Sequence, residues 1–167
     1  MDNRTPEEWL TALKSGAEAL EPIYRAYGKE LYIYAYAIIR DEGVANDAVS
    51  ETMIRLVRLA DRYRPDGNAR AYLFRVCKLV SLELARRHRR DVPSDALPEE
   101  ITTDRPGDTR LFADQLLDRL SVKDRQILVL HYYEDMTFHE IAQIMGMPEG
   151  TVKWRHTKAL ALCRSAV

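Results

Sequence analysis

The stretch Thr137–Arg155, TFHEIAQIMGMPEGTVKWR, determines the fold of the C-terminal part of the chain. Its first four residues form a capping box, in which Thr and Glu side chains satisfy free backbone amides, and they predict a short helix over 138–145. Gly146-Met147-Pro148 predicts a turn, and a longer basic helix follows from Glu149 to about Arg164. Together these elements form a helix-turn-helix motif. Apolar residues stand where its small core needs them: Ile141, Ala142, Ile144, Met147 and Val152.

Apolar residues recur at three- and four-residue steps along much of the remaining chain, which predicts amphipathic helices. A capping box at Thr5 begins a short helix that Gly16 ends. Pro65-Asp66-Gly67-Asn68 predicts a turn before the fourth helix. No segment alternates with a period of two, so we expect an all-α protein. The longer predicted helices cover Leu20–Ile39, about 43–63, about Ala69–Arg90, Thr109–Leu120 and, after Ser121, residues up to Tyr133.

Residues 91–108 differ in composition from the segments on either side. They contain three prolines, one glycine and six acidic residues, with few apolar residues at regular spacing. Such a composition is typical of a flexible linker. We therefore expect two small helical domains, an N-terminal helical bundle at 1–90 and a C-terminal helix-turn-helix domain at 109–167.

The overall composition excludes several classes of protein. With 46% apolar and 31% charged residues, the 167-residue chain is neither wholly disordered nor fibrous. It contains no long uncharged apolar stretch, so we expect no membrane insertion, no signal peptide and a cytoplasmic location. Cys77 and Cys163 are too few for a disulfide scaffold and have no CxxC spacing, so we expect both to be small core residues.

Charge is distributed in blocks along the chain. Residues 62–90 hold nine basic and two acidic side chains, whereas 91–118 hold two basic and eight acidic ones. The last 17 residues carry four basic side chains and no acid. The two basic blocks are candidate surfaces for a polyanion such as DNA. For Arg86–Arg90 the alternative is that these charges only complement a helix dipole.

The second helix of a helix-turn-helix enters the major groove of DNA, so its outward residues should reach base edges. Thr151 and the free amides at the start of this helix are placed to hold a phosphate. Trp154 either contacts a thymine methyl or packs on a neighbouring side chain, and the whole motif could instead pack against a protein. The outward residues are Lys153, Trp154, Thr157 and Lys158, with Arg155 beside them.

Two parts of the chain resemble the extracytoplasmic-function (ECF) group of the bacterial sigma-70 family of transcription initiation factors. The first part comprises 45–56 (ANDAVSETMIRL), 71–76 (AYLFRV) and the Arg86–Arg90 cluster. The second comprises 120–128, 137–142 (TFHEIA) and 150–155 (GTVKWR). Each part alone is only moderately specific for this family. The two parts in this order, on either side of an acidic segment, are strongly specific for it.

The resemblance implies an adaptor that binds core RNA polymerase and directs it to promoter DNA. It implies that Asp47, Glu51 and Arg55 dock on the polymerase. The minus-thirty-five element would be read by the outward residues given above, with Thr151 and also His131. The minus-ten element would be opened and bound as a single strand by Arg62, Tyr63, Arg64, Asp66, Asn68, Tyr72, Arg75, Arg86 and Arg87. An anti-sigma factor that wedges between the two domains is a further expected partner.

Some positions depart from the family pattern. Ser50 stands where Gln is usual, and Tyr72 replaces a common Trp. Leu79 occupies a place where members often carry a polar base reader, which leaves open how, or which, minus-ten base is read. It also leaves open a sigma-like protein that binds polymerase but does not melt DNA. Trp154, where a small residue is common, predicts a distinct minus-thirty-five preference.

No constellation of residues points to an enzyme. His139-Glu140-Ile141-Ala142-Gln143 approaches the zinc-protease motif HExxH, but Gln143 replaces the second histidine. Phosphate-binding glycine motifs and the serine-hydrolase GxSxG are absent from the sequence. We therefore expect no catalytic residue, cofactor, metal site or small-molecule substrate. A helix-turn-helix regulator without polymerase binding remains the alternative, although a receiver domain would need strands that the sequence does not predict.

Overall fold

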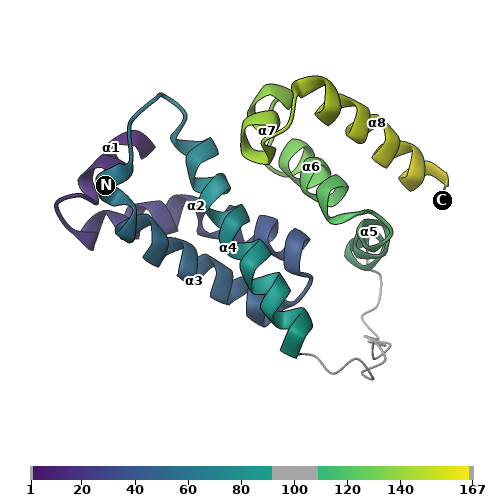
Figure 1. Ribbon diagram of the computed structural model, residues 1–167, viewed down its shortest axis with the longest axis horizontal. Helices are drawn as coiled ribbons and strands as arrows, with labels where there is room; N and C mark the ends of the chain where they lie inside the picture. The colour runs from purple at the N-terminus through teal and green to yellow at the C-terminus, as the bar shows by residue number, and fades with distance from the viewer. Residues whose placement is uncertain (1, 92–108, 166–167) are drawn as a thin grey trace.

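The computed structural model describes residues 2–91 and 109–165, and only the backbone of 109–113. Within these ranges all regular structure is helical, as predicted, and the helices form two groups (Figure 1). The segment predicted as a linker lies outside the described residues except for Asp91, which ends a helix. The helices are α1 (Pro6–Ala12), α2 (Leu20–Ile39), α3 (Glu42–Arg58), α4 (Ala69–Asp91), α5 (Thr109–Asp118), α6 (Val122–Tyr132), α7 (Phe138–Met145) and α8 (Glu149–Ser165), with 3₁₀ turns at Ala17–Ala19 and Ala60–Arg62.

Most helix boundaries agree with the predicted ones, but α1 ends at Ala12 rather than at Gly16, α5 ends at Asp118 rather than at Leu120, and α3 also ends early. The predicted helix reached about Tyr63, but α3 ends at Arg58 and a 3₁₀ turn follows. Tyr63 has extended backbone, with φ −65° and ψ 132°, and its ring packs 4.9 Å from that of Tyr72. This packing of Tyr63, which is 3% exposed, turns the chain inward where helical periodicity alone would have continued it.

The first group of helices is built around α2, α3 and α4, with α1 against α2 and α4. Tyr34 and Phe74 are fully buried at its centre, with ring centroids 5.4 Å apart. Cys77 is also fully buried, and burial raises the pKa of its thiol to about 11. Cys77 is therefore the inert core cysteine that the sequence predicts, whereas Cys163 is half-buried.

The second group contains the predicted helix-turn-helix. Thr137 and Glu140 form the predicted capping box, and Gly146 ends α7 in the left-handed conformation with φ 64°. Glycine suits this position because an L side chain strains a backbone with positive φ. The predicted core residues Ile141, Ile144 and Val152 are buried, and Ala142 and Met147 pack half-buried against them.

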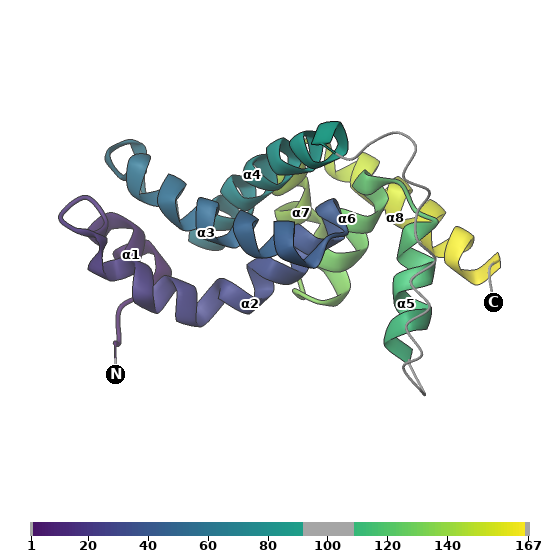
Figure 2. The ribbon, with the colours of Figure 1, turned by 90° about the horizontal axis from the view of Figure 1, so that it is seen from below.

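The two groups pack directly against each other (Figure 2). Helix α2 contacts α6, and α4 contacts α7, so most of the buried apolar residues of both groups form one continuous core, while Leu120, Leu128 and Ala159 form a smaller cluster within the second group. The Tyr34 hydroxyl donates a 2.7 Å hydrogen bond to Gln126, and the Arg125 guanidinium donates a 2.8 Å bond from Nε to the Ala37 carbonyl. The faces between which an anti-sigma factor was expected to wedge therefore cover each other in this structure. In the described part of the chain, no helix combines the length and apolar character needed to cross a membrane.

Candidate nucleic-acid interfaces

The outward face of α8 carries four of the residues predicted to read DNA. Lys153, Trp154, Thr157 and Lys158 are all exposed, and Trp154 has 60% of its surface accessible. The Lys158 ammonium lies 5.3 Å from the centre of the Trp154 ring, which is cation–π geometry. Trp154 therefore stands free of the protein core, next to a cation that can hold a phosphate. Thr151, at the start of the helix, is half-buried.

Arg155 points toward the protein rather than along the outward face. Its Nη1 donates a 3.0 Å bond to the carboxylate of Asp124 on α6, a side chain that is only 2% exposed. The Arg155 Nε is buried and has no hydrogen-bond partner among the described residues. This ion pair fixes α8 against α6. The pattern of local apolar residues gave no signal for it, because the two residues are 31 positions apart.

His131, predicted to reach the same groove, belongs to a cluster of rings that joins α6, α7 and α8. We call His131, Tyr132, Phe138 and His156 the ring cluster. His131 stacks on Phe138 with centroids 4.6 Å apart, and its Nδ1 lies 2.9 Å from the Met136 carbonyl, so Nδ1 carries the hydrogen. His131 therefore supports α8 from behind rather than lying on its outward face.

Tyr132 and His156 are members of the ring cluster that sequence reasoning missed. The Tyr132 hydroxyl and His156 Nε2 are 2.9 Å apart, and the two rings stack at 5.6 Å. Burial and the neighbouring His131 lower the pKa of His156. A neutral His156 accepts the tyrosine hydrogen at Nε2. In the sequence, the pair of consecutive aromatic residues Tyr132-Tyr133 before the turn was the signal that could have pointed to this surface. In the structure they are 54% and 60% exposed.

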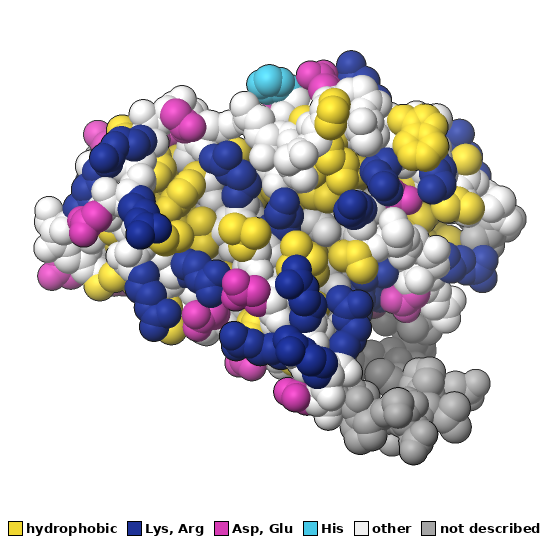
Figure 3. All heavy atoms as spheres, viewed as in Figure 1, with side chains coloured by type: hydrophobic (Ala, Val, Ile, Leu, Met, Phe, Trp, Pro, Cys, Tyr) yellow, Lys and Arg dark blue, Asp and Glu magenta, His cyan; other side chains and the backbone are white. Residues whose placement is uncertain are grey.

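The predicted minus-ten residues lie on α4 and on the turn that precedes it. Arg62, Arg64, Asp66, Arg86 and Arg87 are exposed, whereas Asn68, Tyr72 and Arg75 are half-buried. Tyr63 is the exception, because it lies in the core behind Tyr72. Figure 3 shows Lys and Arg side chains along α4 and again near α8 on the same face of the molecule.

The positive surface of α4 continues onto the second group of helices. Burial and the charges of Arg75 and Lys123 lower the pKa of Lys78, which places Lys78 of α4 near Lys123 of α6. Leu79, next to Lys78, is 55% exposed. An anionic strand would neutralise this accumulation of like charges, and Leu79 offers it an apolar contact.

The turn before α4 is tied to the helix-turn-helix. The Asp66 carboxylate accepts a 3.0 Å bond from the Asn68 amide, which shapes the turn. The side-chain amide of Asn68 donates to the side-chain carbonyl of Gln143 on α7. Asn68 is therefore occupied by a contact with the second group, which sequence reasoning did not foresee.

The residues predicted to dock on polymerase share one face of α3. Asp47 is exposed, and Glu51 and Arg55 are half-buried one and two turns further on. Arg55 Nη2 lies 3.0 Å from Glu83 Oε2 and 3.9 Å from Glu51 Oε1. The bond to Glu83 raises the pKa of Arg55 and lowers that of Glu83. Arg55 therefore links α3 to α4, while Asp47 and Glu51 leave acidic charge at the surface.

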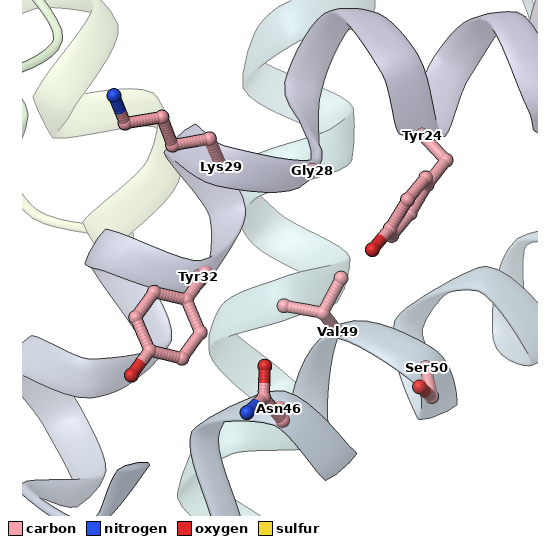
Figure 4. A pocket seen from close by; sticks show the side chains of 7 residues that line it. All are labelled: Tyr24, Gly28, Lys29, Tyr32, Asn46, Val49 and Ser50. Carbon is pink, nitrogen blue, oxygen red and sulfur yellow. The ribbon is translucent and has the colours of Figure 1, made fainter.

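A hollow of about 350 Å³ lies beside this acidic face, between α2 and α3 (Figure 4). Tyr24 and Tyr32 border it from α2, and Val49 and Asn46 border it from α3. Tyr24 is 59% exposed, so its ring is accessible at the edge of the hollow. The hollow combines aromatic and polar groups, and its lining residue Asn46 is the sequence neighbour of Asp47.

A helix-turn-helix packed against a helical bundle that carries basic residues along α4 is an architecture suited to binding DNA. The family model "Sigma-70 region 2" matches residues 23–91, and "Sigma-70, region 4" matches 116–165. The ECF RNA polymerase sigma factor SigL of Mycobacterium tuberculosis is 34% identical over 158 residues, which cover 84% of this chain and 87% of SigL. The chain belongs to the ECF group of sigma-70 family sigma factors, and it is a promoter-directing sigma factor.

Other relatives and solved structures agree with this placement. SigE of Mycolicibacterium smegmatis is 30% identical over 146 residues, covering 81% of this chain but only 56% of SigE. The structure of CnrH in complex with the cytosolic domain of CnrY is 20% identical, with a TM-score of 0.74 and 97% of each chain covered. The sigma factor RpoE of Bartonella quintana, in complex with the anti-sigma factor NepR, is 19% identical with a TM-score of 0.70, covering 87% of this chain and 94% of RpoE. These two structures have the same fold as this chain.

Proposed function

We propose that this chain binds core RNA polymerase through α3 and directs it to promoters by reading duplex DNA with α8 and single-stranded DNA with α4 and the turn before it. The division into a minus-ten domain at 1–90 and a minus-thirty-five domain at 109–167 belongs to this proposal. The observation that supports it most is the presence, in one ECF sigma chain, of basic residues along both α4 and α8, each next to an exposed apolar or aromatic side chain, Leu79 on α4 and Trp154 on α8. The protein acts by binding, in the cytoplasm, and the polymerase supplies the catalytic chemistry.

The minus-thirty-five element is proposed to contact the outward face of α8. Lys153 and Lys158 can donate hydrogen bonds to phosphates and base edges, and the exposed ring of Trp154 can make apolar contact with a thymine methyl. Arg155 and His131 take a different role from the one expected from the sequence, since each is held by a contact inside the protein. We assign them to positioning α8 in the groove.

The minus-ten element is proposed to contact the face of α4 as a single strand. Tyr72 is half-exposed and braced from behind by Tyr63, so it can stack on an unpaired base without moving. Arg62, Arg64 and Arg75 suit the backbone phosphates. Leu79 presents an apolar surface where a hydrogen-bonding reader is common, so the base next to it is selected by shape and stacking.

The polymerase surface is proposed to comprise Asp47, Glu51 and the adjoining hollow. An acidic helix face next to the exposed Tyr24 complements a basic helix with apolar residues. Arg55 supports this face through Glu83 and Glu51. A regulatory partner is also proposed, because CnrH and RpoE are described in complexes with CnrY and with the anti-sigma factor NepR.

Co-elution of the purified chain with bacterial core RNA polymerase on a sizing column tests the proposal. We expect the chain to co-elute, and Glu51→Lys to weaken binding at least tenfold without loss of helix content. Glu18→Lys, an exposed charge reversal outside α3, is the matched control and should bind normally. If the unsubstituted chain fails to co-elute, it is a helix-turn-helix regulator that acts without polymerase. If it co-elutes but supports no transcription, the exposed Leu79 points to a sigma-like protein that does not melt DNA.

A further inference from the structure

Two carboxyl groups and one guanidinium meet where the two groups of helices pack together. Glu134 lies in the turn between α6 and α7, Glu30 on α2 and Arg70 on α4. Glu134 is only 3% exposed. The next residue in the same turn, Asp135, has a left-handed backbone with φ 51°. One buried carboxyl from the second group and two half-buried charged side chains from the first therefore meet at one site.

Arg70 neutralises only one of the two carboxylates. Its Nη2 donates to the Glu134 backbone carbonyl and lies 3.6 Å from Glu134 Oε2. Its guanidinium also lies 6.0 Å from the centre of the Phe74 ring, which fixes its direction. With both carboxyl groups ionised, the site would keep one uncompensated negative charge, and burying such a charge is costly.

Glu30 places a second carboxyl group beside Glu134. Its Oε2 is buried without a hydrogen-bond partner among the described residues, and its charge acts on Glu134. Two carboxylates only accept hydrogen bonds, so a bond between them forms only when one of them carries a proton. Adding one proton to Glu134 permits such a bond and removes the excess charge in a single step.

The surrounding charges favour the protonated form. Burial, and after it the negative charge of Glu30, raise the pKa of Glu134 to about 7, with Asp135 acting in the same direction and Arg70 against it. Tyr27 of α2 lies near the same groups, and burial raises its pKa further above 10, so it remains neutral. Glu7 of α1, near Tyr27, adds negative charge on the far side.

We propose that Glu30, Arg70 and Glu134 form a proton-dependent latch, which holds the two groups of helices together when the carboxyl pair binds a proton and weakens their contact when the proton is lost. The other polar contacts across this interface include the bonds from Tyr34 to Gln126 and from Arg125 to Ala37, and the ion pairs of Arg40 with Asp114 and Asp118. Among the groups that make these contacts, Glu134 is the one whose pKa is raised toward neutrality.

The latch bears on promoter use, and this consequence rests on the proposed function. In the closed arrangement Asn68, from the turn assigned to the minus-ten strand, is bonded to Gln143 of α7. Separating the groups would free that turn and let the two DNA-reading surfaces adopt the spacing that a promoter requires. Acidification would thus favour a closed form with lower promoter affinity.

The direction of the pH effect follows from proton linkage. The pKa of Glu134 is raised in the closed form, so closing takes up a proton between the ordinary glutamate pKa and about 7. The latch is fully formed at acidic pH and is lost as the pH rises through about 7. The ratio of closed to open molecules should fall roughly tenfold or more between about pH 5.5 and about pH 8.

Small-angle X-ray scattering of the full chain across this pH range measures the closed fraction without DNA or polymerase. We expect the unsubstituted chain to expand as the pH rises. Glu134→Gln, which mimics the protonated carboxyl, should remain closed throughout. Glu30→Gln should move the midpoint to lower pH, because it removes the repulsion that raises the Glu134 pKa.

Glu18→Gln is the matched control, since it neutralises an exposed acid of the first group that is not among the charges acting on Glu134. It should keep the pH response of the unsubstituted chain. A chain whose dimensions do not change with pH, or a Glu134→Gln variant that expands as the unsubstituted chain does, would overturn the latch. Because neither polymerase nor promoter takes part, this outcome is independent of whether the proposed function holds.

Discussion

The two DNA-facing surfaces differ in how their residues are held. The outward side chains of α8 stand on a helix that is fixed from behind by the Asp124–Arg155 ion pair and the ring cluster. The residues assigned to the minus-ten strand lie partly on the turn before α4, which bonds to a neighbouring helix through Asn68. A rigid helix suits a duplex of regular shape, whereas a turn with exchangeable contacts suits a strand that must first be unpaired.

The largest expected effect is on the rigid surface. Asp124→Asn leaves the partly buried Arg155 without its charge partner, and breaking a buried ion pair typically costs about 3 kcal/mol or more. Urea unfolding of the full chain should show this loss. Glu149→Gln, which removes an exposed partner of Lys153, should change the unfolding free energy by less than about 1 kcal/mol. Equal effects of the two substitutions would show that Arg155 does not anchor α8.

Removing the two lysines of α8 tests whether this surface contacts the phosphates of the DNA backbone. Lys153→Ala with Lys158→Ala should lower affinity for duplex promoter DNA by about tenfold or more at moderate salt. Each lost phosphate contact also reduces the slope of log affinity against log salt by roughly 0.9. Fluorescence anisotropy at several salt concentrations measures both quantities. Lys14→Ala, an exposed lysine of the first group, is the control, and a slope unchanged in the double variant would remove both lysines from the interface.

Tyr72 tests the adaptable surface in the same way. Stacking of one base on an aromatic ring is worth about 1–3 kcal/mol, so Tyr72→Ala should weaken binding of a single-stranded minus-ten oligonucleotide by roughly tenfold. Tyr72→Phe keeps the ring and should bind normally. Binding to duplex minus-thirty-five DNA should not change in either variant. A loss of affinity in Tyr72→Phe equal to that in Tyr72→Ala would indicate that the hydroxyl, not stacking, matters.

The smallest effect concerns the ring cluster and pH. The pKa of His156 is lowered in the folded chain, so folding disfavours its protonated form and stability should decrease as the pH falls through the ordinary histidine range near 6.5. A protonated His156 also cannot accept the Tyr132 hydrogen. The loss should be about 1 kcal/mol or less. His156→Gln should flatten this part of the profile, and an unchanged profile would assign it to other groups.

The sequence predicted the helices well because their signals are local. The bounds of α2 and α7 follow from apolar periodicity and capping residues within a few positions of each other. Tyr63 escaped prediction because its burial depends on Tyr72, across a turn. Asp124, Gln143 and Glu134 escaped it because each finds its partner only after distant helices have packed. Residue type and spacing thus indicated which surfaces are basic, but not which arginines and histidines face inward.

The most direct test of the account is transcription by core RNA polymerase reconstituted with this chain on a library of randomised promoters. The account predicts transcripts whose promoters share two separate elements. Trp154→Ser should alter the preferred upstream element alone, and Leu79→Asn should alter the preferred downstream element alone. Two results would contradict the assignment of duplex reading to α8 and of single-strand binding to α4. The first is transcripts whose promoters share no upstream element, and the second is a changed downstream element in Trp154→Ser.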